Sequence, residues 1–287
     1  MALLRNIGTT LEMIKWEHSI FALPFALTGA MLAAHGWPHL SQLLWIIVCM
    51  VTARSAAMAF NRWADASLDA DNPRTASRAI PAGLLTRGFV GAFTACMAIA
   101  FILAASQLNR LTLLLSPVAL AIVLLYSYTK RFTRWSHLFL GLALGSAPAA
   151  AWIAIRGTLD PRILVLTAAV LFWVAGFDVL YACQDAEHDR AHGLRSLPAA
   201  IGIANAFWVA RFMHLVMLVL LLRLTQLFAL GTIASVGIVA VALLLLYEHL
   251  IVSPRDMRRL NAAFFTMNGV ISVVFFVFVA VDLLTHK

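Results

Sequence analysis

Long runs of apolar residues alternate with short polar segments along the whole chain. Most runs are close to the roughly 20 residues that an α-helix needs to cross the hydrocarbon core of a membrane. They lie at 19–34, 41–60, 88–106, 111–128, 137–155, 162–181, 205–222, 227–250 and 262–284. The pattern predicts an all-α, polytopic membrane protein, with nine transmembrane helices in a single domain over residues 1–287. Residues 1–17 mix apolar and charged positions, which predicts an amphipathic helix at the membrane surface.

Composition excludes the main classes of soluble protein. Of the 287 residues, 62% are hydrophobic and only 12% are charged, whereas an average soluble domain has roughly 25% charged residues. One soluble core cannot bury this number of apolar residues. We therefore exclude a soluble enzyme, a disordered chain and a nucleic-acid-binding module. The net charge is +8. We interpret the excess of basic residues as signals that set the membrane topology and as contacts to the lipid bilayer or to an anionic substrate.

The positions of the basic residues predict how the chain lies in the membrane. Fourteen Lys and Arg residues fall in the N-terminal segment and in the loops after the second, fourth, sixth and eighth spans, and five fall on the other side. Because cytoplasmic loops carry an excess of Lys and Arg, we predict that the N-terminus and these four loops are cytoplasmic. The protein is expected in a cytoplasmic membrane.

The few acidic residues are clustered. Seven of the thirteen lie in the segments 61–71 and 178–189. Each segment carries three polar side chains at steps of four, and the two sets are offset by 120 residues. The sets are Asn61, Asp65 and Asp69, and Tyr181, Asp185 and Asp189. A step of four places side chains on one helix face. Since both segments end a span on the same side, we predict two parallel repeats of about four helices, plus one further helix.

These acidic faces predict a site for a divalent cation. Carboxylates on one helix face repel each other and are costly near a membrane, unless a cation neutralises them. Oxygen ligands suit Mg²⁺, which usually takes one or two carboxylates together with substrate phosphates. A charge run outside a span is more often a solvated loop, but the duplicated spacing favours the cation site. The predicted ligands are Asn61, Asp65, Asp69, Asp185 and Asp189, and the four aspartates are also the predicted catalytic group.

The two segments resemble the signatures of the UbiA superfamily of intramembrane aromatic prenyltransferases. These signatures are N-x-x-x-D-x-x-x-D and D-x-x-Y-A-x-x-D-x-x-x-D. They correspond here to Asn61, Asp65 and Asp69, and to Asp178, Tyr181, Ala182, Asp185 and Asp189. The resemblance covers essentially the whole chain. Within the superfamily, the sequence is most similar to the 4-hydroxybenzoate polyprenyltransferases. Arg62 stands where many relatives carry Asp, and Glu17-His18-Ser19 stands where many carry Asp-Arg-Pro.

The resemblance implies a nine-helix bundle around a cavity that opens to lipid and is capped by the two motif loops. It implies that a polyprenyl group moves from polyprenyl diphosphate to a ring carbon of an aromatic acid, in quinone biosynthesis. The cofactor would be Mg²⁺, with Mn²⁺ as an alternative. The acceptor is either a 4-hydroxybenzoate-like acid or a naphthoate-type precursor of menaquinone, and the sequence leaves both open, together with the prenyl chain length.

Further residues are candidates for the two substrates. Diphosphate leaves readily only when its developing charge is neutralised. The candidates for diphosphate contact are Arg74, Arg78, Lys130, Arg131 and Arg195, each with a topology charge as the alternative. The candidates for acceptor binding or cavity lining are Arg54, Tyr181, Asp178 and His18. Arg54 lies inside the second span, where an arginine is by default a functional hypothesis. It would hold the carboxylate of the acceptor or, as the alternative, pair with a neighbouring helix.

Other classes of membrane protein fit less well. An ion-coupled transporter would place ionisable residues near the bilayer midplane, often within inverted repeats, whereas these carboxylates end their spans and the repeat is parallel. The CDP-alcohol phosphotransferases also use clustered Asp and a divalent metal, but their Asp-Gly and Ala-Arg signature is absent. Prenylation of haem or chlorophyll is a further alternative within the same superfamily.

Overall fold

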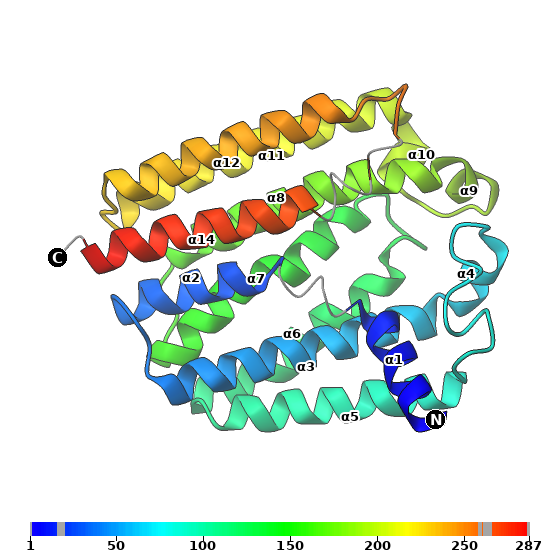
Figure 1. The fold of residues 1–287 in the computed structure, drawn as a ribbon, viewed down its shortest axis with the longest axis horizontal. Helices are drawn as coiled ribbons and strands as arrows, with labels where there is room; N and C mark the ends of the chain where they lie inside the picture. Colours follow the sequence, from blue (N-terminus) through cyan, green and yellow to red (C-terminus); the bar gives the residue numbers. More distant parts are fainter. Residues whose placement is uncertain (1, 16–20, 258–259, 261–265, 286–287) are drawn as a thin grey trace.

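The computed structural model describes residues 2–15, 21–257, 260 and 266–285 (Figure 1). Within these residues the chain is almost entirely helical. The β-type pairing found there is one isolated bridge between Ser253 and Asp256. The prediction of an all-α protein is confirmed.

Eight helices in the described part of the chain are long and apolar enough to cross a membrane. They are α3 (Leu40–Ala64), α5 (Arg87–Ser106), α6 (Arg110–Thr129), α7 (Ser136–Arg156), α8 (Ile163–Ala182), α11 (Ile203–Leu227), α12 (Thr232–Ile251) and α14 (Asn268–Thr285). A shorter apolar helix, α2 (Leu23–Ala34), has 12 residues. These nine helices correspond to the nine predicted spans. The remaining elements are α1 (Ala2–Ile14), α4 (Ala66–Asp71), η2 (Cys183–Asp185), α9 (Ala186–Ala191) and α10 (Leu197–Ile201).

The predicted boundary between the seventh and eighth spans is wrong, because the span predicted at 205–222 continues as α11 to Leu227. The apolar run at 227–250 predicts a helix from residue 227, but α12 begins at Thr232. Apolar residues continue through the turn at 228–231, so hydropathy alone cannot mark it. The helix start is instead fixed by Asp282 of α14, whose carboxylate accepts hydrogen bonds from the backbone N–H groups of Gly231 at 2.7 Å and Ala234 at 3.1 Å. These donors have no partner within the helix, so the carboxylate acts as a cap from another span.

The helices form two groups joined by a central pair. The helices α3, α5 and α6 pack together on one side, α11, α12 and α14 follow one another on the other side, and α7 pairs with α8 between them (Figure 1). The helix α2 packs against both α7 and α14. The ring of Phe25 lies 5.0 Å from that of Trp173 and 5.4 Å from that of Phe275. These buried contacts hold the first apolar helix against α8 and the last helix.

Glycines allow α7 to approach its neighbours closely. A Cβ atom added to Gly141 would lie 2.4 Å from the carbonyl oxygen of Leu171, and one added to Gly145 would lie 2.8 Å from that of Thr167. Small residues at such contacts are typical of membrane helices, which associate mainly through close van der Waals packing. The close packing fixes the relative position of α7 and α8, which both carry residues of the site described below.

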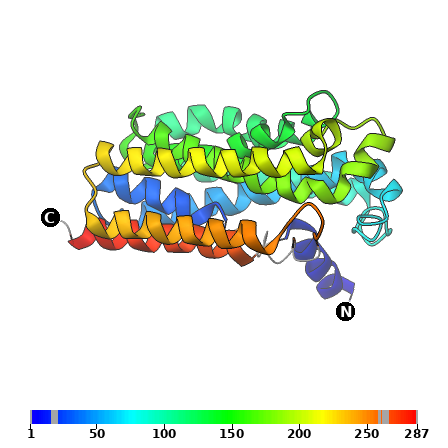
Figure 2. The same ribbon diagram turned by 90° about the horizontal axis from the view of Figure 1, so that it is seen from above.

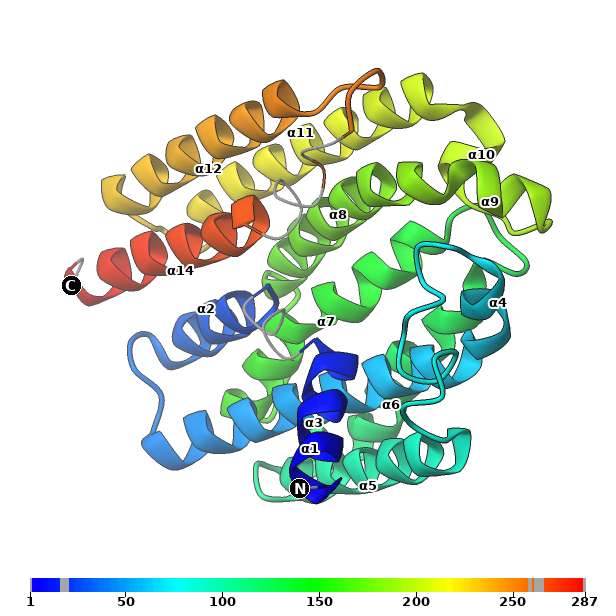
Figure 3. The same cartoon turned by 45° about the vertical axis from the view of Figure 1, so that its right-hand side comes forward.

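The two motif segments have the same local backbone. Asp65 joins α3 to α4 with φ −95° and ψ 6°, and Asp185 precedes α9 with φ −103° and ψ 3°. Both short helices lie together at one end of the bundle, where α4 faces α9 (Figure 3). The expected single helix face is therefore interrupted in both repeats at the central aspartate.

The N-terminal helix α1 projects from the bundle (Figure 2). Its last residues, Met13 and Ile14, are buried in a small apolar cluster with Ala59 of α3, Leu85 just before α5 and Val90 of α5. An amphipathic segment ahead of the first apolar helix is thus present as predicted. Its position at the membrane surface stays a prediction.

Candidate active site

The two motif segments meet at a cavity of about 560 Å³. Its wall is formed by the ends of α3, α6, α7 and α8, together with the loop that follows α4. The predicted site residues on this wall are Asn61, Asp65, Asp69, Asp185, Asp189, Arg74, Arg78, Lys130, Arg54, Asp178 and Tyr181. Residues from both repeats therefore face one space, at the end of the bundle where the motif loops lie.

The buried carboxylate of Asp65 is held by two cations. Lys130 Nζ lies 3.0 Å from Oδ2 and Arg131 Nη2 lies 3.1 Å from Oδ1. Asn61 Nδ2 also donates to Oδ2, at 3.2 Å. Arg131 donates in addition to the carbonyl oxygen of Ala64 at 2.7 Å, at the end of α3. A carboxylate with 2% exposure is stable here because opposite charges and hydrogen bonds offset its loss of water.

Asp69 has one paired and one unpaired carboxylate oxygen. Its Oδ1 lies 2.6 Å from Arg78 Nη1, and its backbone carbonyl accepts a hydrogen bond from Thr75 Oγ1 at 3.0 Å. Its buried Oδ2 has no hydrogen-bond partner within the described part of the chain. Buried polar atoms are normally satisfied, so this oxygen on the cavity wall is the kind of atom that a bound cation would complete.

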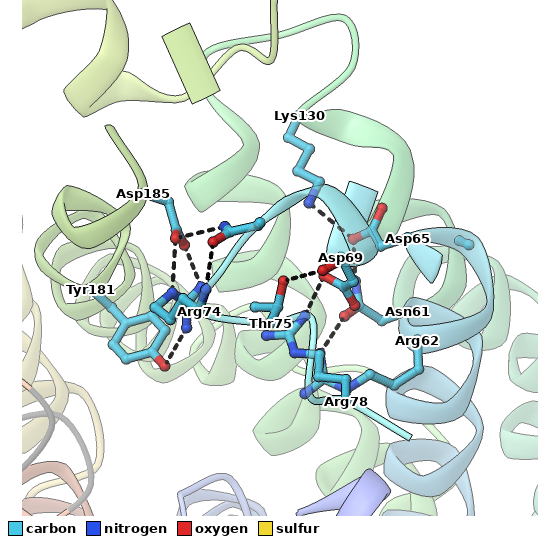
Figure 4. A network of polar contacts seen from close by, with 12 residues as sticks. Asn61, Arg62, Asp65, Asp69, Arg74, Thr75, Arg78, Lys130, Tyr181 and Asp185 are labelled. Atoms are coloured by element: carbon cyan, nitrogen blue, oxygen red, sulfur yellow. Dashed lines mark hydrogen bonds and ion pairs between the residues drawn. The ribbon is translucent and has the colours of Figure 1, made fainter. Parts of the chain in front are cut away.

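Asp185 is linked to the loop of the other repeat (Figure 4). Arg74 Nε donates to Asp185 Oδ1 at 2.8 Å, Arg74 Nη2 contacts Oδ2, and Asn72 Nδ2 donates to Oδ1 at 3.1 Å. Arg74 Nη1 also donates to Tyr181 Oη at 3.2 Å. Burial tends to lower the pKa of Arg74, but the hydrogen bonds and attraction to Asp185 outweigh it and raise that pKa. Arg74 therefore stays charged and ties the two repeats together across the cavity.

Asp178 lies on the same wall and is paired with a histidine. His137 Nδ1 lies 2.7 Å from Asp178 Oδ2, and His137 Nε2 accepts the backbone N–H of Leu197 at 3.3 Å. Because a backbone N–H can only donate, Nε2 carries no proton, and the neutral ring donates from Nδ1 to the carboxylate. The backbone of α10 thus fixes the histidine, and the histidine fixes Asp178.

Arg54 reaches the cavity from α3, about two turns before Asn61. Its Nη2 donates to the backbone carbonyl of Lys15 at 3.5 Å, and its buried Nε has no partner among the described residues. Most of its guanidinium donors therefore have no acceptor within the part of the chain that the structure describes. His18, the other candidate for the acceptor, lies outside the described residues.

Two predicted cations do not line the cavity. Arg131 is absent from its wall, although it contacts Asp65. Arg195 points elsewhere, since its Nη1 donates to the carbonyl oxygen of Phe132 at 2.9 Å and its backbone N–H donates to that of Lys130 at 2.7 Å. The turn at 192–195 directs this side chain to the outer face of the loop. Its role at the diphosphate is therefore not supported by its position.

Some residues on the wall were missed from sequence. Arg62 lines the cavity, and its Nη1 donates to Asn61 Oδ1 at 3.4 Å. Its position directly after the first motif residue would have been enough to predict it as a site residue. Asn72 and His137 pair with aspartates 113 and 41 residues away. No local pattern marks such pairs, because they depend on how the helices pack.

The oxygen-rich donor set fits a hard cation. Within the described residues, no three His, Cys, Asp or Glu side chains converge closely enough to hold a metal ion on their own. Asp65, Asp69 and Asp185 are instead each paired with a cation. An Mg²⁺ ion that takes one or two carboxylates and completes its shell with phosphate oxygens and water is compatible with this arrangement.

Comparison with known proteins identifies the family. The model of the UbiA prenyltransferase family matches residues 22–270. A protein named 4-hydroxybenzoate octaprenyltransferase from Vibrio cholerae serotype O1 is 31% identical over 255 residues, which are 88% of each chain. One of the same name from Nitrosospira multiformis is 30% identical over 249 residues, which are 87% of this chain and 86% of that one.

Solved structures agree with this assignment. The apo structure of a UbiA homolog from Aeropyrum pernix K1 has a TM-score of 0.83 and 33% identity, and covers 93% of this chain and 98% of its own. A UbiA homolog from Archaeoglobus fulgidus bound to DMAPP and Mg²⁺ has a TM-score of 0.75 at 18% identity, with coverages of 96% and 99%, and supports the fold. The chain is therefore an integral membrane protein that belongs to the UbiA prenyltransferase family.

Proposed function

We propose that this enzyme transfers a polyprenyl group from polyprenyl diphosphate to a ring carbon of a 4-hydroxybenzoate-like aromatic acid, in quinone biosynthesis. The observation that carries the proposal is the convergence of both aspartate motifs and several cations on one cavity. The name shared by the curated relatives supports the acceptor class. The DMAPP and Mg²⁺ bound to an archaeal structure of the same fold support the donor and the metal.

The diphosphate is proposed to bind by an exchange of partners. Arg74, Arg78 and Lys130 are each paired with a motif aspartate at the cavity. A bound diphosphate offers these cations a second set of anionic oxygens, which suits the forked guanidinium of arginine. The aspartates are then free to hold the metal. Because each cation already faces the cavity, little rearrangement is needed to receive the donor.

The metal would be held by the oxygen atoms of both motifs. The proposed ligands are Asn61, Asp65, Asp69, Asp185 and Asp189, and the unpaired Oδ2 of Asp69 is the first available position. When bound, Mg²⁺ would neutralise charge on the leaving diphosphate.

The acceptor is proposed to bind deeper in the cavity. The guanidinium donors of Arg54 that have no acceptor among the described residues suit the carboxylate of an aromatic acid. The C–O bond of the donor breaks and its electron pair leaves with the diphosphate, and the ring carbon then forms a C–C bond to the allylic cation. The displaced ring proton passes to Asp178, which is held by a neutral histidine rather than by a lysine or arginine.

A direct assay tests the proposal and the choice of acceptor. Purified protein in detergent is incubated with a polyprenyl diphosphate, Mg²⁺ and either 4-hydroxybenzoate or a naphthoate-type acid, with and without EDTA. We expect a prenylated product with 4-hydroxybenzoate and none in EDTA. Full activity in EDTA would contradict the metal assignment. Faster prenylation of the naphthoate-type acid would show that the acceptor is a menaquinone precursor, prenylated by the same reaction.

A further inference from the structure

A second hollow lies beside the catalytic cavity. Its volume is about 530 Å³, and it is formed by the loop after α6 and by the segment that runs from α9 to α10. Leu194 and Ser196 line both spaces. The two spaces therefore share part of one wall, although the aspartate motifs face only the first.

Three exposed arginines make this hollow strongly basic. They are Arg134, Arg190 and Arg195. Arg190 and Arg195 donate to the backbone carbonyls of Ala199 and Phe132, at 3.2 and 2.9 Å. Within the described chain, none of the three forms an ion pair and no acidic side chain lines the hollow. Three cations with most of their N–H donors free form a site for a multidentate anion such as a phosphate.

Aromatic side chains border the same hollow. Phe132 is 58% exposed and Trp135 is 41% exposed, and both belong to the loop between α6 and α7. The guanidinium of Arg134 lies over the Trp135 ring, with its central carbon 5.7 Å from the centroid. Exposed aromatic residues at the ends of spans are typical of the membrane interface, where one part of the ring meets acyl chains and the other meets headgroups. A soluble anion has no acyl chains to pack against these two rings, whereas a lipid does.

We propose that this hollow binds the phosphodiester of an anionic glycerophospholipid, with the headgroup among the three arginines and the upper acyl chains against Phe132 and Trp135. Basic pockets between spans on the cytoplasmic side of a membrane bind anionic headgroups in this way. The proposal goes beyond the transfer reaction, because the lipid is neither donor nor acceptor.

The bound lipid would also support the catalytic loop. The backbone N–H of Arg195 donates to the carbonyl oxygen of Lys130 at 2.7 Å, and Lys130 contacts Asp65. A headgroup that holds Arg134 and Arg195 together therefore fixes the segment from Lys130 to Trp135 at both ends. We expect anionic lipid to raise the rate of prenyl transfer, a part that rests on the proposed function.

Lipid binding is tested in nanodiscs and by native mass spectrometry. The variant Arg134→Gln/Arg190→Gln removes two charges from the hollow and leaves Arg195 in place. The matched control, Arg110→Gln/Arg156→Gln, removes two exposed arginines from the opposite end of the bundle. At about 1 kcal/mol per cation, the first variant should bind phosphatidylglycerol about 30-fold more weakly than wild type, and the control should retain its binding there. Equal retention by both variants would refute the site.

A second measurement does not depend on a variant. A photoactivatable phosphatidylglycerol should crosslink to residues 132–135 or 190–200 of the wild-type chain, and a phosphatidylcholine probe should do so much less. Displacement of the anionic probe by inorganic phosphate at matched concentration would identify a free-phosphate site and overturn the lipid. A raised KM for polyprenyl diphosphate in the first variant, in discs of phosphatidylcholine alone, would assign the hollow to the donor and also overturn it. Binding without any prenyl transfer would instead contradict the proposed function alone.

Discussion

Replacement of Arg54 by alanine separates the two substrates of the reaction. Arg54 lies about two turns deeper than the first motif residue, and its Nε has no partner among the described residues. If its guanidinium forms two charge-assisted hydrogen bonds with the acceptor carboxylate, at about 1.5 kcal/mol each at the low end, their loss costs about 3 kcal/mol. The KM for the acceptor should then rise by about 100-fold or more.

The KM for polyprenyl diphosphate should change little in the same variant. That substrate is assigned to the loop cations and the metal, whereas the hydrogen bond that Arg54 forms in the described structure is to the backbone carbonyl of Lys15. A loss that appears in KM for one substrate, with kcat nearly unchanged, is the kinetic signature of lost ground-state binding. The assay is steady-state kinetics with each substrate varied in turn.

Arg54→Lys provides the matched control. Lysine keeps the charge but not the planar fork, so the acceptor KM should fall between those of wild type and the alanine variant. Equal loss of affinity for both substrates, together with a lower yield of folded protein, would show that Arg54 is a structural residue. That result would refute its assignment to the acceptor.

Three further predictions concern the metal, the packing and the topology. Asp185→Asn should lower kcat by about 100-fold, comparable to the loss of one preorganised charge-stabilising group; activity within a few-fold of wild type would contradict its role. Gly145→Ala should lower the melting temperature, because its Cβ would meet a backbone oxygen at 2.8 Å, whereas Gly88→Ala, with nothing within 4 Å, should not. The cost of such overpacking is about 1–3 kcal/mol. Cysteines introduced at 72–86 and 192–196 should be labelled from the same, cytoplasmic side, and labelling from opposite sides would be incompatible with one site.

Much of this architecture follows from the order of residues along the chain. Apolar runs predict the spans because a lipid environment demands them. The steps of four, from Asn61 and from Tyr181, predict which side chains gather at the helix ends. Contacts between segments far apart in the chain cannot be predicted from local sequence in this way. That Arg74 reaches Asp185, or that Asp282 caps α12, depends on helix packing and on side-chain direction.

The direction of a side chain is the main property that local pattern leaves open. Arg195 follows the second motif as Arg78 follows the first, yet Arg78 contacts Asp69 and Arg195 contacts the carbonyl oxygen of Phe132. Equivalent positions in a repeat therefore do not guarantee equivalent contacts, because the loops around them differ in length and partners. Conversely, His137 has no motif around it, and its pairing with Asp178 follows only from the close packing of α7 on α8.

The position of α2 against α14 has a consequence for the order of assembly during synthesis. Asn268 is made 234 residues after Ala34, which takes about 12–47 s at about 5–20 residues per second. Until then, the face of α2 that carries Phe25 lacks one of its final partners and is covered by lipid at little cost, since lipid tails are as apolar as the missing helix. The first apolar helix, α2, therefore completes its packing only after the last helix has been made. Two half-chains divided in the loop at 157–162 and expressed together should assemble into active enzyme, because α2 of the first half still has its surface on α14 of the second.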